Sequence, residues 1–320
     1  MHAHDAAVIE SLISQEMVPP AVAMSRSTDP LGLMRVENVN VAFAAVHMTA
    51  IDGGRMSIAP SEHRVRSADG TDIGFLAHGR GPAIVFVHGG LTMGDEWRAV
   101  AAELADRFTC LIMTRRGRGR SGDAADYSLD KEREDIQAVM TIAGGGATLL
   151  GHSYGAVCAL EAARVGAIRR LILYEPPLPI DAPVVGPAFG DVRAAVASGQ
   201  FDSALTIMLR DLVHVSAAQL EGLRRSPIWT DMAALTPTVV RELEVLGRLE
   251  PGVDRFRRVS SPTLLLLGTE TAPHHSVASN ALQRALPNAR TVLLDGQGHE
   301  AHIAVPNLVA TRIAEFLRVE

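Results

Sequence analysis

The sequence has few of the residues that mark several common classes of protein. Its 320 residues include two cysteines, Cys110 and Cys158, so a fold held together by several disulfide bonds is excluded. Each cysteine lies in an apolar run, and we therefore expect reduced, buried thiols in a cytoplasmic protein. Aromatic residues make up 4% of the chain and the formal net charge is −6, so the composition offers no basis for binding nucleic acid.

Long uninterrupted apolar runs are also lacking. The longest early run, residues 39–51, is interrupted by Asn40 and His47 and is too short and too polar to cross a bilayer, so we expect no membrane span. We expect no secretory signal either, because the first residues contain no basic segment followed by an apolar one. Hydrophobic residues nevertheless make up 47% of the sequence, which is enough for a sizeable core.

Three regions of the chain differ in pattern. Residues 1–62 do not fit the rest; residues 6–17 have the spacing of a short amphipathic helix, and we expect an N-terminal extension of uncertain order. In residues 63–177 and 259–320, short apolar runs alternate with helical segments, which indicates an α/β core with a mostly parallel sheet flanked by helices. Residues 178–258 show helical patterns punctuated by prolines, and we expect a helical cap inserted before the last two strands.

The expected elements of the core and cap follow from these patterns. Strands are expected over 64–67, 71–77, 82–87, 108–113, 147–150, 171–174, 263–267 and 290–294. Helices are expected over 97–105, 129–142, 156–165, 192–197, 203–213, 217–224, 238–248, 276–285 and 308–317. The first two strands flank Ala68-Asp69-Gly70 and are expected to form a hairpin.

A five-residue stretch, Gly151-His152-Ser153-Tyr154-Gly155, separates an expected strand from an expected helix. A tight turn at this point brings strand and helix too close for a Cβ atom at the flanking glycines, and it exposes the serine hydroxyl above the end of the sheet. A glycine-rich loop in an ordinary domain can carry the same pattern by chance. The strand–turn–helix context favours a nucleophile at Ser153.

A serine hydroxyl is a weak nucleophile at neutral pH, so it needs a base, and the base needs an orienting carboxylate. His299 lies in a glycine-rich turn after the last expected strand, from which an imidazole can reach toward Ser153. Glu175 and Glu270 also follow expected strands. Because catalytic groups gather at the carboxyl ends of parallel strands, either glutamate is a candidate partner of His299.

Residues 63–320 resemble the α/β-hydrolase superfamily. The resemblance is carried by His88-Gly89-Gly90 with Trp97 downstream, by residues 116–121, by the turn around Ser153 and by Gly296-Gln297-Gly298-His299. It implies an α/β-hydrolase fold with Ser153 as nucleophile and His299 as general base. It also implies an oxyanion hole made by the backbone amides of Gly90 and Tyr154.

The acid is where the sequence departs from the family pattern. The family most often places an aspartate in the region that corresponds to residues 268–273, which here contains Glu270 and no aspartate. Some members, haloalkane dehalogenases among them, carry the acid after the previous strand, where this chain has Glu175 beside two prolines. We favour Glu175 as the acid and keep Glu270 as the alternative. The family's usual aspartate before the glycine-rich turn at 117–119 is Thr114 here, and we expect the neighbouring arginines to hold that turn.

These observations predict a serine hydrolase without a cofactor, which cleaves an ester, lactone or thioester of a small to medium hydrophobic substrate through an acyl-enzyme on Ser153. Some apolar residues of the cap are expected to line the substrate pocket; the candidates are Phe189, Phe201, Met208, Leu212, Ile228, Trp229 and Met232. A metal site is not expected, because His274-His275 have no carboxylate or thiolate partners at ligand spacing.

Three other functions remain open from the sequence. The same fold can host a non-hydrolytic or C–C bond-processing enzyme of a biosynthetic pathway, because a fold does not fix a function. A haloperoxidase-like perhydrolase would use the same three residues. A binding protein with a relict triad is the third alternative, and assembly into a homo-oligomer is possible for each of them.

Overall fold

The computed structural model describes residues 48–52, 55–213 and 215–318. They belong to a unit that spans Ala45–Glu320. The helix expected over residues 6–17, like most of the expected extension 1–62, lies outside the described residues. Within that extension, β1 (Met48–Asp52) and β2 (Arg55–Ile58) pair as an antiparallel two-stranded sheet.

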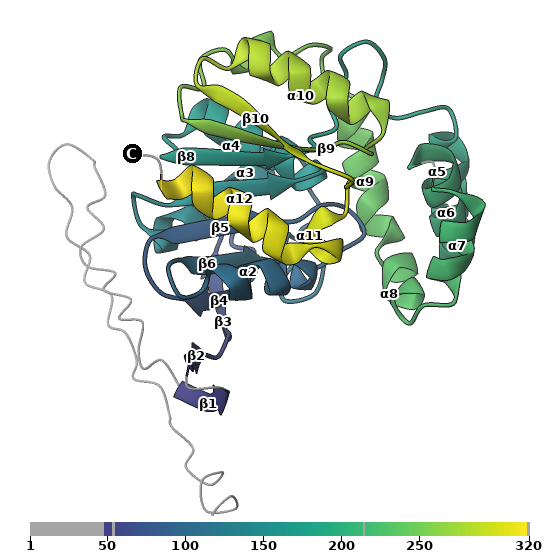
Figure 1. The fold of residues 1–320 in the computed structure, drawn as a ribbon. Helices are drawn as coiled ribbons and strands as arrows, with labels where there is room; N and C mark the ends of the chain where they lie inside the picture. Colours follow the sequence, from purple (N-terminus) through teal and green to yellow (C-terminus); the bar gives the residue numbers. More distant parts are fainter. Residues whose placement is uncertain (1–47, 53–54, 214, 319–320) are drawn as a thin grey trace, which may run out of the picture. The chain divides into compact units, whose positions relative to one another are not determined.

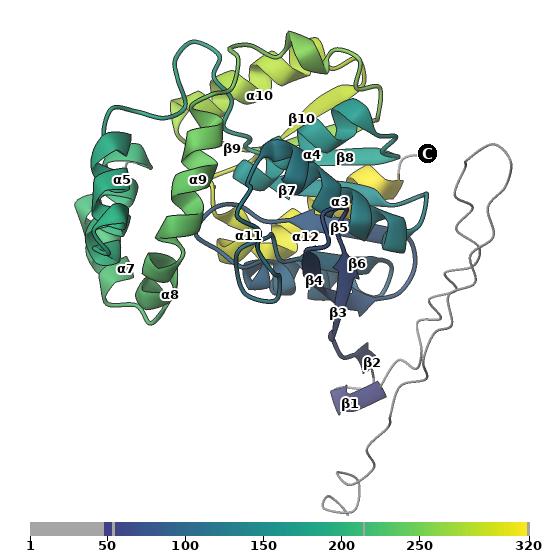
Figure 2. The same cartoon turned by 180° about the vertical axis from the view of Figure 1, so that it is seen from behind.

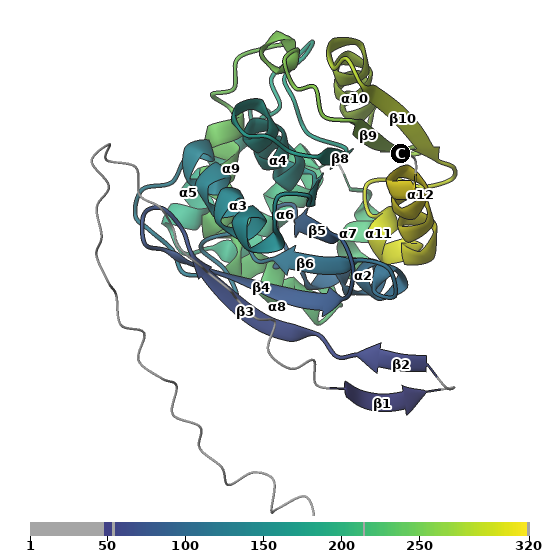
Figure 3. The ribbon, with the colours of Figure 1, turned by 90° about the vertical axis from the view of Figure 1, so that its left-hand side faces the viewer.

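An eight-stranded sheet forms the core, in the order β10-β9-β8-β7-β5-β6-β4-β3. Its strands are β3 (Ser61–Arg66), β4 (Asp72–Gly79), β5 (Ala83–Val87), β6 (Thr109–Met113), β7 (Thr148–His152), β8 (Arg170–Tyr174), β9 (Thr263–Gly268) and β10 (Ala289–Leu294). The pairs β3–β4 and β4–β6 are antiparallel, and all other neighbours are parallel. Figure 3 shows β3, β4, β6 and β5 in succession at one edge.

The inner strands of the sheet are buried because their side chains alternate between two apolar layers. In β5, Ile84 and Phe86 join one core cluster, whereas Val85 and Val87 join the other. A strand that is covered on both faces needs an apolar residue at every position, which explains the continuous apolar runs in the sequence.

Helices cover both faces of the sheet. One core cluster contains residues of α3 (Leu129–Ala143), α4 (Tyr154–Val165) and α10 (Pro273–Ala285). The other contains residues of α2 (Arg98–Leu104) and α12 (Pro306–Arg318). Three shorter helical turns connect longer elements: η1 (Asp95–Trp97), η3 (Asp254–Phe256) and α11 (Ala301–Ala304).

A helical insert joins β8 to β9, ahead of the last two strands. It contains α5 (Phe189–Ala197), α6 (Phe201–Ile207), the π-helical turn η2 (Met208–Leu212), α7 (Ala217–Arg224), α8 (Ile228–Ala234) and α9 (Thr236–Leu246). Opposite views show α9 next to the core, with α5 and α7 on its outer side (Figure 1 and Figure 2). The expected fold class is therefore confirmed, while the cap boundaries of 178 and 258 stay a prediction.

The sequence pattern was least informative within the insert. Helix α8 is not among the expected helices, because a proline such as Pro227 usually interrupts a helix. Pro227 instead occupies the N-cap of α8, where its missing amide costs no hydrogen bond. Pro237 likewise lies in the first turn of α9, which begins two residues before the expected helix. The helix expected over 203–213 changes from α to π geometry at Met208.

The structure bears on the expected state of the cysteines and on the expected lack of a membrane span. Both cysteines are free and buried, as expected. Within the described residues, no helix combines the length and the apolar character that crossing a bilayer requires. The cytoplasmic location stays a prediction.

The close approach of β7, α4 and β5 makes Gly155 a sensitive position. A Cβ at Gly155 would collide with the backbone carbonyls of Val87 and His88, whereas a Cβ at Gly222 in α7 would meet no described atom within 4 Å. We expect Gly155→Ala to lower the free energy of unfolding by about 1–3 kcal/mol, because backbone cannot yield as a flexible side chain does. Gly222→Ala should leave it unchanged or raise it slightly. Urea denaturation of both variants tests this, and equal midpoints would contradict it.

Candidate active site

Ser153 occupies a strained turn between β7 and α4. Its φ of 53° lies in the left-handed region that residues with a side chain rarely adopt. The Ser153 amide donates to the carbonyl of Tyr174, at the end of the neighbouring strand β8, over 2.9 Å. The side chain is half-buried, and the turn directly follows the carboxyl end of β7.

Glu175 follows β8 and contacts His299, the residue expected to act as base. Nδ1 of His299 lies 2.6 Å from Oε2 of Glu175, and the glutamate side chain is fully buried. The amide of Gly268 and the hydroxyl of Thr271 donate to the same carboxylate, each over 2.8 Å. Because a carboxylate accepts hydrogen bonds, the neutral form of the His299 ring carries its proton on Nδ1 and keeps the lone pair on Nε2.

Glu270 lies elsewhere on the same rim. It is exposed, and its backbone amide donates to the carbonyl of Gln297 over 2.9 Å. The structure therefore brings Glu175 to His299 and leaves the Glu270 carboxylate at the surface of the described part of the chain.

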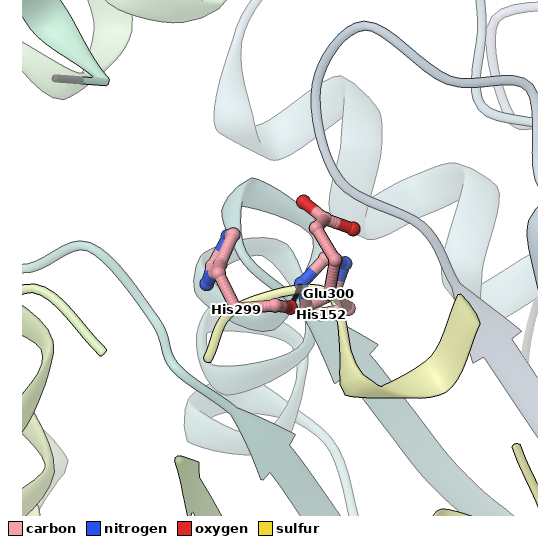
Figure 4. Close-up of side chains that lie close together, drawn as sticks. All are labelled: His152, His299 and Glu300. Carbon is pink, nitrogen blue, oxygen red and sulfur yellow. Dashed lines mark hydrogen bonds between the residues drawn. The ribbon is translucent and has the colours of Figure 1, made fainter. Parts of the chain in front are cut away.

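Three further histidines surround His299. The ring of His275 stacks on it at 4.4 Å with an interplanar angle of 12°, and the ring of His152 lies 4.5 Å away. His152 donates from Nε2 to the backbone carbonyl of His299 over 3.1 Å, and its own ring lies 4.5 Å from that of His302. Figure 4 shows His152 and His299 together with Glu300, the next residue in the chain.

The four histidines differ in their readiness to take a proton. Burial lowers the pKa of His152 and His275 and lowers that of His302 to about 3, with repulsion from His299 adding to the effect in each. Burial also disfavours the charged form of His299, but the hydrogen bond to Glu175 and the charges of Glu300 and Glu175 outweigh it. The pKa of His299 is therefore raised, and His299 is the member of this cluster that can accept a proton near neutral pH.

The loop after β5 lies against the Ser153 turn. A Cβ at Gly89 would lie 3.0 Å from the Ser153 Cβ, so any side chain at this position would have to displace its neighbours. The amide of Arg115 donates to Nε2 of the buried His88 over 3.0 Å, and Nδ1 of His88 in turn contacts the carbonyl of Gly89 over 2.9 Å. His88 thus shapes the loop that carries Gly90, one of the two expected oxyanion donors.

The expected role of the arginines near residues 117–119 is borne out by their contacts. Arg115 and Arg116 are fully buried. Arg115 donates to Glu132 over 2.7 Å, and Arg116 makes two hydrogen bonds of 2.7 Å to Asp135. The charged half of α3, which a sequence pattern would place in solvent, therefore anchors the turn after β6.

Two groups of side chains have the composition of a metal site. They are His152, His299 and Glu300, and Glu175, His275 and His299; within each group the candidate ligand atoms lie within 4.8 Å of one another. Both groups use His299. In the second, the hydrogen bond between His299 and Glu175 already occupies atoms that a metal would need.

One hollow lies in the insert. It has a volume of about 450 Å³, and its lining residues are Asp202, Ser203, Thr206, Ile207, Arg224 and Trp229. Of the seven apolar cap residues proposed to meet the substrate, Trp229 lines this hollow, Met208 is buried in the insert, and Phe201 and Ile228 are exposed. Which of the seven meet the substrate stays a prediction.

Comparison with known proteins places the chain in a family. Residues 84–315 match the model of the Alpha/beta hydrolase family. The chain belongs to this family. An alpha/beta hydrolase from Sphaerobacter thermophilus has a similar structure, with a TM-score of 0.72 and 32% identity, covering 80% of this chain and all of that one. The sheet and its insert are thus an α/β-hydrolase fold, as the sequence resemblance implied.

Two curated relatives are similar in sequence. N-formylmaleamate deformylase of Pseudomonas putida is 37% identical over 118 residues, which span 35% of this chain and 44% of the deformylase. A pimeloyl-[acyl-carrier protein] methyl ester esterase of Nitrosomonas europaea is 27% identical over 247 residues, 71% of this chain and 92% of the esterase. The curated relatives of this chain therefore include an esterase and a deformylase.

Some residues of the site were not recognised from the sequence. The hydroxyl of Tyr174 donates to the carbonyl of Gly298 and accepts from the amide of Ala301 over 3.1 Å, so it fixes both sides of His299. Its position directly before Glu175 was the available signal. Glu242 lies on α9, 127 residues from Arg115, and no local pattern connects the two.

The raised pKa of His299 leads to a prediction about Glu300. Removing its negative charge should lower the pKa of His299, because the imidazolium loses a favourable interaction. We expect this fall in Glu300→Gln and no change in Asp295→Asn, which neutralises a carboxylate of the same turn that does not act on the pKa of His299. NMR titration of the His299 ring, assigned with a His299→Gln variant, measures it. Equal values in the two variants would show that Glu300 has no such role.

Proposed function

We propose that the protein is a serine hydrolase in which Ser153, His299 and Glu175 form a catalytic triad. The observation that carries the proposal is the 2.6 Å hydrogen bond between His299 and the buried Glu175, which in the neutral ring keeps the proton on Nδ1 and leaves Nε2 as the basic nitrogen. The strained turn at Ser153 supports it, since such backbone strain is concentrated at functional sites. The raised pKa of His299 suits a general base that works near neutral pH.

The proposed reaction has two steps. The Ser153 hydroxyl attacks a carbonyl carbon and gives its proton to Nε2 of His299, while Glu175 stabilises the imidazolium. The amides of Gly90 and Tyr154 stabilise the negative charge on the carbonyl oxygen, with about 3 kcal/mol for each donor. His299 then protonates the leaving group, which departs, and an acyl-enzyme remains. Water attacks this ester with His299 as base, and the acid product and the free serine are released.

An ester, lactone or thioester with a small to medium apolar acyl group is the proposed substrate. The positive charges of Arg115 and Arg118, near Gly89 and Gly90, are balanced by Glu132 and Glu242. This neutrality supports an uncharged acyl group beside the oxyanion hole. One curated relative is named as a methyl ester esterase and another as a deformylase, so related proteins act on more than one kind of acyl compound.

Covalent labelling tests the nucleophile. We expect a fluorophosphonate probe to label the protein at Ser153, as located by peptide mass spectrometry, because the probe reacts with an activated serine. Ser153→Ala should not be labelled, and its hydrolysis of short 4-nitrophenyl esters should fall by about 10⁴-fold or more. A folded wild-type protein that remains unlabelled and hydrolyses no ester would reject the proposal in favour of a binding role.

A matched pair of variants tests the acid. Glu175→Gln should lower kcat by about 10³- to 10⁴-fold, because a neutral amide neither fixes the His299 tautomer nor stabilises its charged form. Glu270→Gln should stay close to wild type, since this carboxylate is exposed. Steady-state kinetics on one ester substrate, with active sites counted by the labelling reaction, compares them. Equal small losses would reject Glu175 as the acid.

A further inference from the structure

We propose that Glu242, on α9 of the insert, is a positioning residue for the oxyanion loop and acts through Arg115. This inference rests on the proposed function, because it assigns Glu242 to the same reaction. It gives the insert a part in the chemical step in addition to any part in holding the substrate.

Glu242 joins the insert to the core through two buried arginines. Its side chain is 2% exposed, and its Oε1 accepts from Arg115 over 2.9 Å and from Arg118. Both arginine side chains are fully buried. Because both side chains are buried away from solvent, each guanidinium depends on these carboxylates for the hydrogen bonds and charge that solvent would otherwise supply.

Arg115 in turn contacts both halves of the proposed oxyanion hole. One terminal nitrogen donates to the carbonyl of Gly89 over 3.1 Å, directly before Gly90. The guanidinium also lies over the ring of Tyr154, 4.5 Å from its centre. The orientation of this one side chain therefore affects the residues beside both proposed donor amides.

Helix α9 also packs directly against the loop. A Cβ at Gly90 would lie 3.4 Å from Oε2 of Glu242 and 3.9 Å from the Val239 side chain. Leu91, which has a positive φ of 55°, packs against the apolar cluster of the insert that contains Val239. The insert thus holds the loop both at Gly90 and at Leu91.

Removal of the Glu242 carboxylate should loosen the loop that carries Gly90. Arg115 keeps Glu132 as a partner but loses the group that aligns it from the other side. The Gly89 carbonyl and the adjacent Gly90 amide can then shift relative to Ser153. Stabilisation of an oxyanion depends steeply on donor position, since a displacement of about 1 Å can cost about 10²-fold in rate. Substrate binding in the ground state depends on it much less.

The test compares Glu242→Gln with Glu244→Gln. Both remove one carboxylate from α9, but residues two positions apart on a helix do not share a face. With active sites counted by fluorophosphonate labelling, we expect Glu242→Gln to lower kcat on a 4-nitrophenyl ester by about 10- to 100-fold with little change in KM. Affinity for a trifluoromethyl ketone that mimics the oxyanion should fall by the same factor. Glu244→Gln should match wild type in both measurements.

The pH profile separates positioning from a general loss of structure. Glu242 is not among the groups that shift the pKa of His299, so the acid limb of kcat/KM should stay at the wild-type pH in Glu242→Gln. If Glu242→Gln does not fold, Glu242→Asp keeps the charge and shortens the reach, and the same loss of kcat and of ketone affinity is expected. A folded variant with wild-type kcat and ketone affinity, or one that changes only KM, overturns the inference. A wild-type protein without labelling at Ser153 overturns the proposed function itself.

Discussion

Backbone strain in three segments that follow strands is the constraint on which the site depends. Among the described residues, Leu91, Ser153 and Glu175 are the non-glycine residues with positive φ, and they follow β5, β7 and β8, which are consecutive in the sheet. Each such conformation costs about 1–3 kcal/mol unless its surroundings impose it. The Ser153 amide bonds to the carbonyl of Tyr174, so two of these turns support each other.

Buried ion pairs stabilise the neighbouring turn after β6. Arg115, Arg116 and their partners Glu132 and Asp135 are completely buried, and they join the turn after β6 to α3. Removing one partner from such a pair typically costs about 3–5 kcal/mol, because the remaining charge has neither water nor a counter-ion. Glu242 extends this network to the insert. The insert is therefore attached to the core by buried ion pairs, which are costly to break, as well as by apolar contacts.

Much of the core could be predicted because its signals are local. The run before Gly151 is mostly apolar since β7 is covered on both faces, and the glycines of the turn follow from the close approach of α4. The insert was harder to predict, because its helices pack partly on one another. From the sequence, a proline at the start of a helix, as in α8, cannot be distinguished from a proline in a loop between two helices.

The sequence by itself determined the α/β fold, the tight turn at Ser153 and the placement of His299 after the last strand. These features depend on short-range periodicity and on turn residues, and both can be recognised without knowing the tertiary structure. Only the tertiary structure decided which glutamate lies against His299 and which carboxylate pairs with Arg115. The partners Glu175 and His299 are 124 residues apart, and Arg115 and Glu242 are 127 apart. Contacts at such separations arise from the order of strands in the sheet and from the packing of α9 on it, and no local pattern in the chain encodes them.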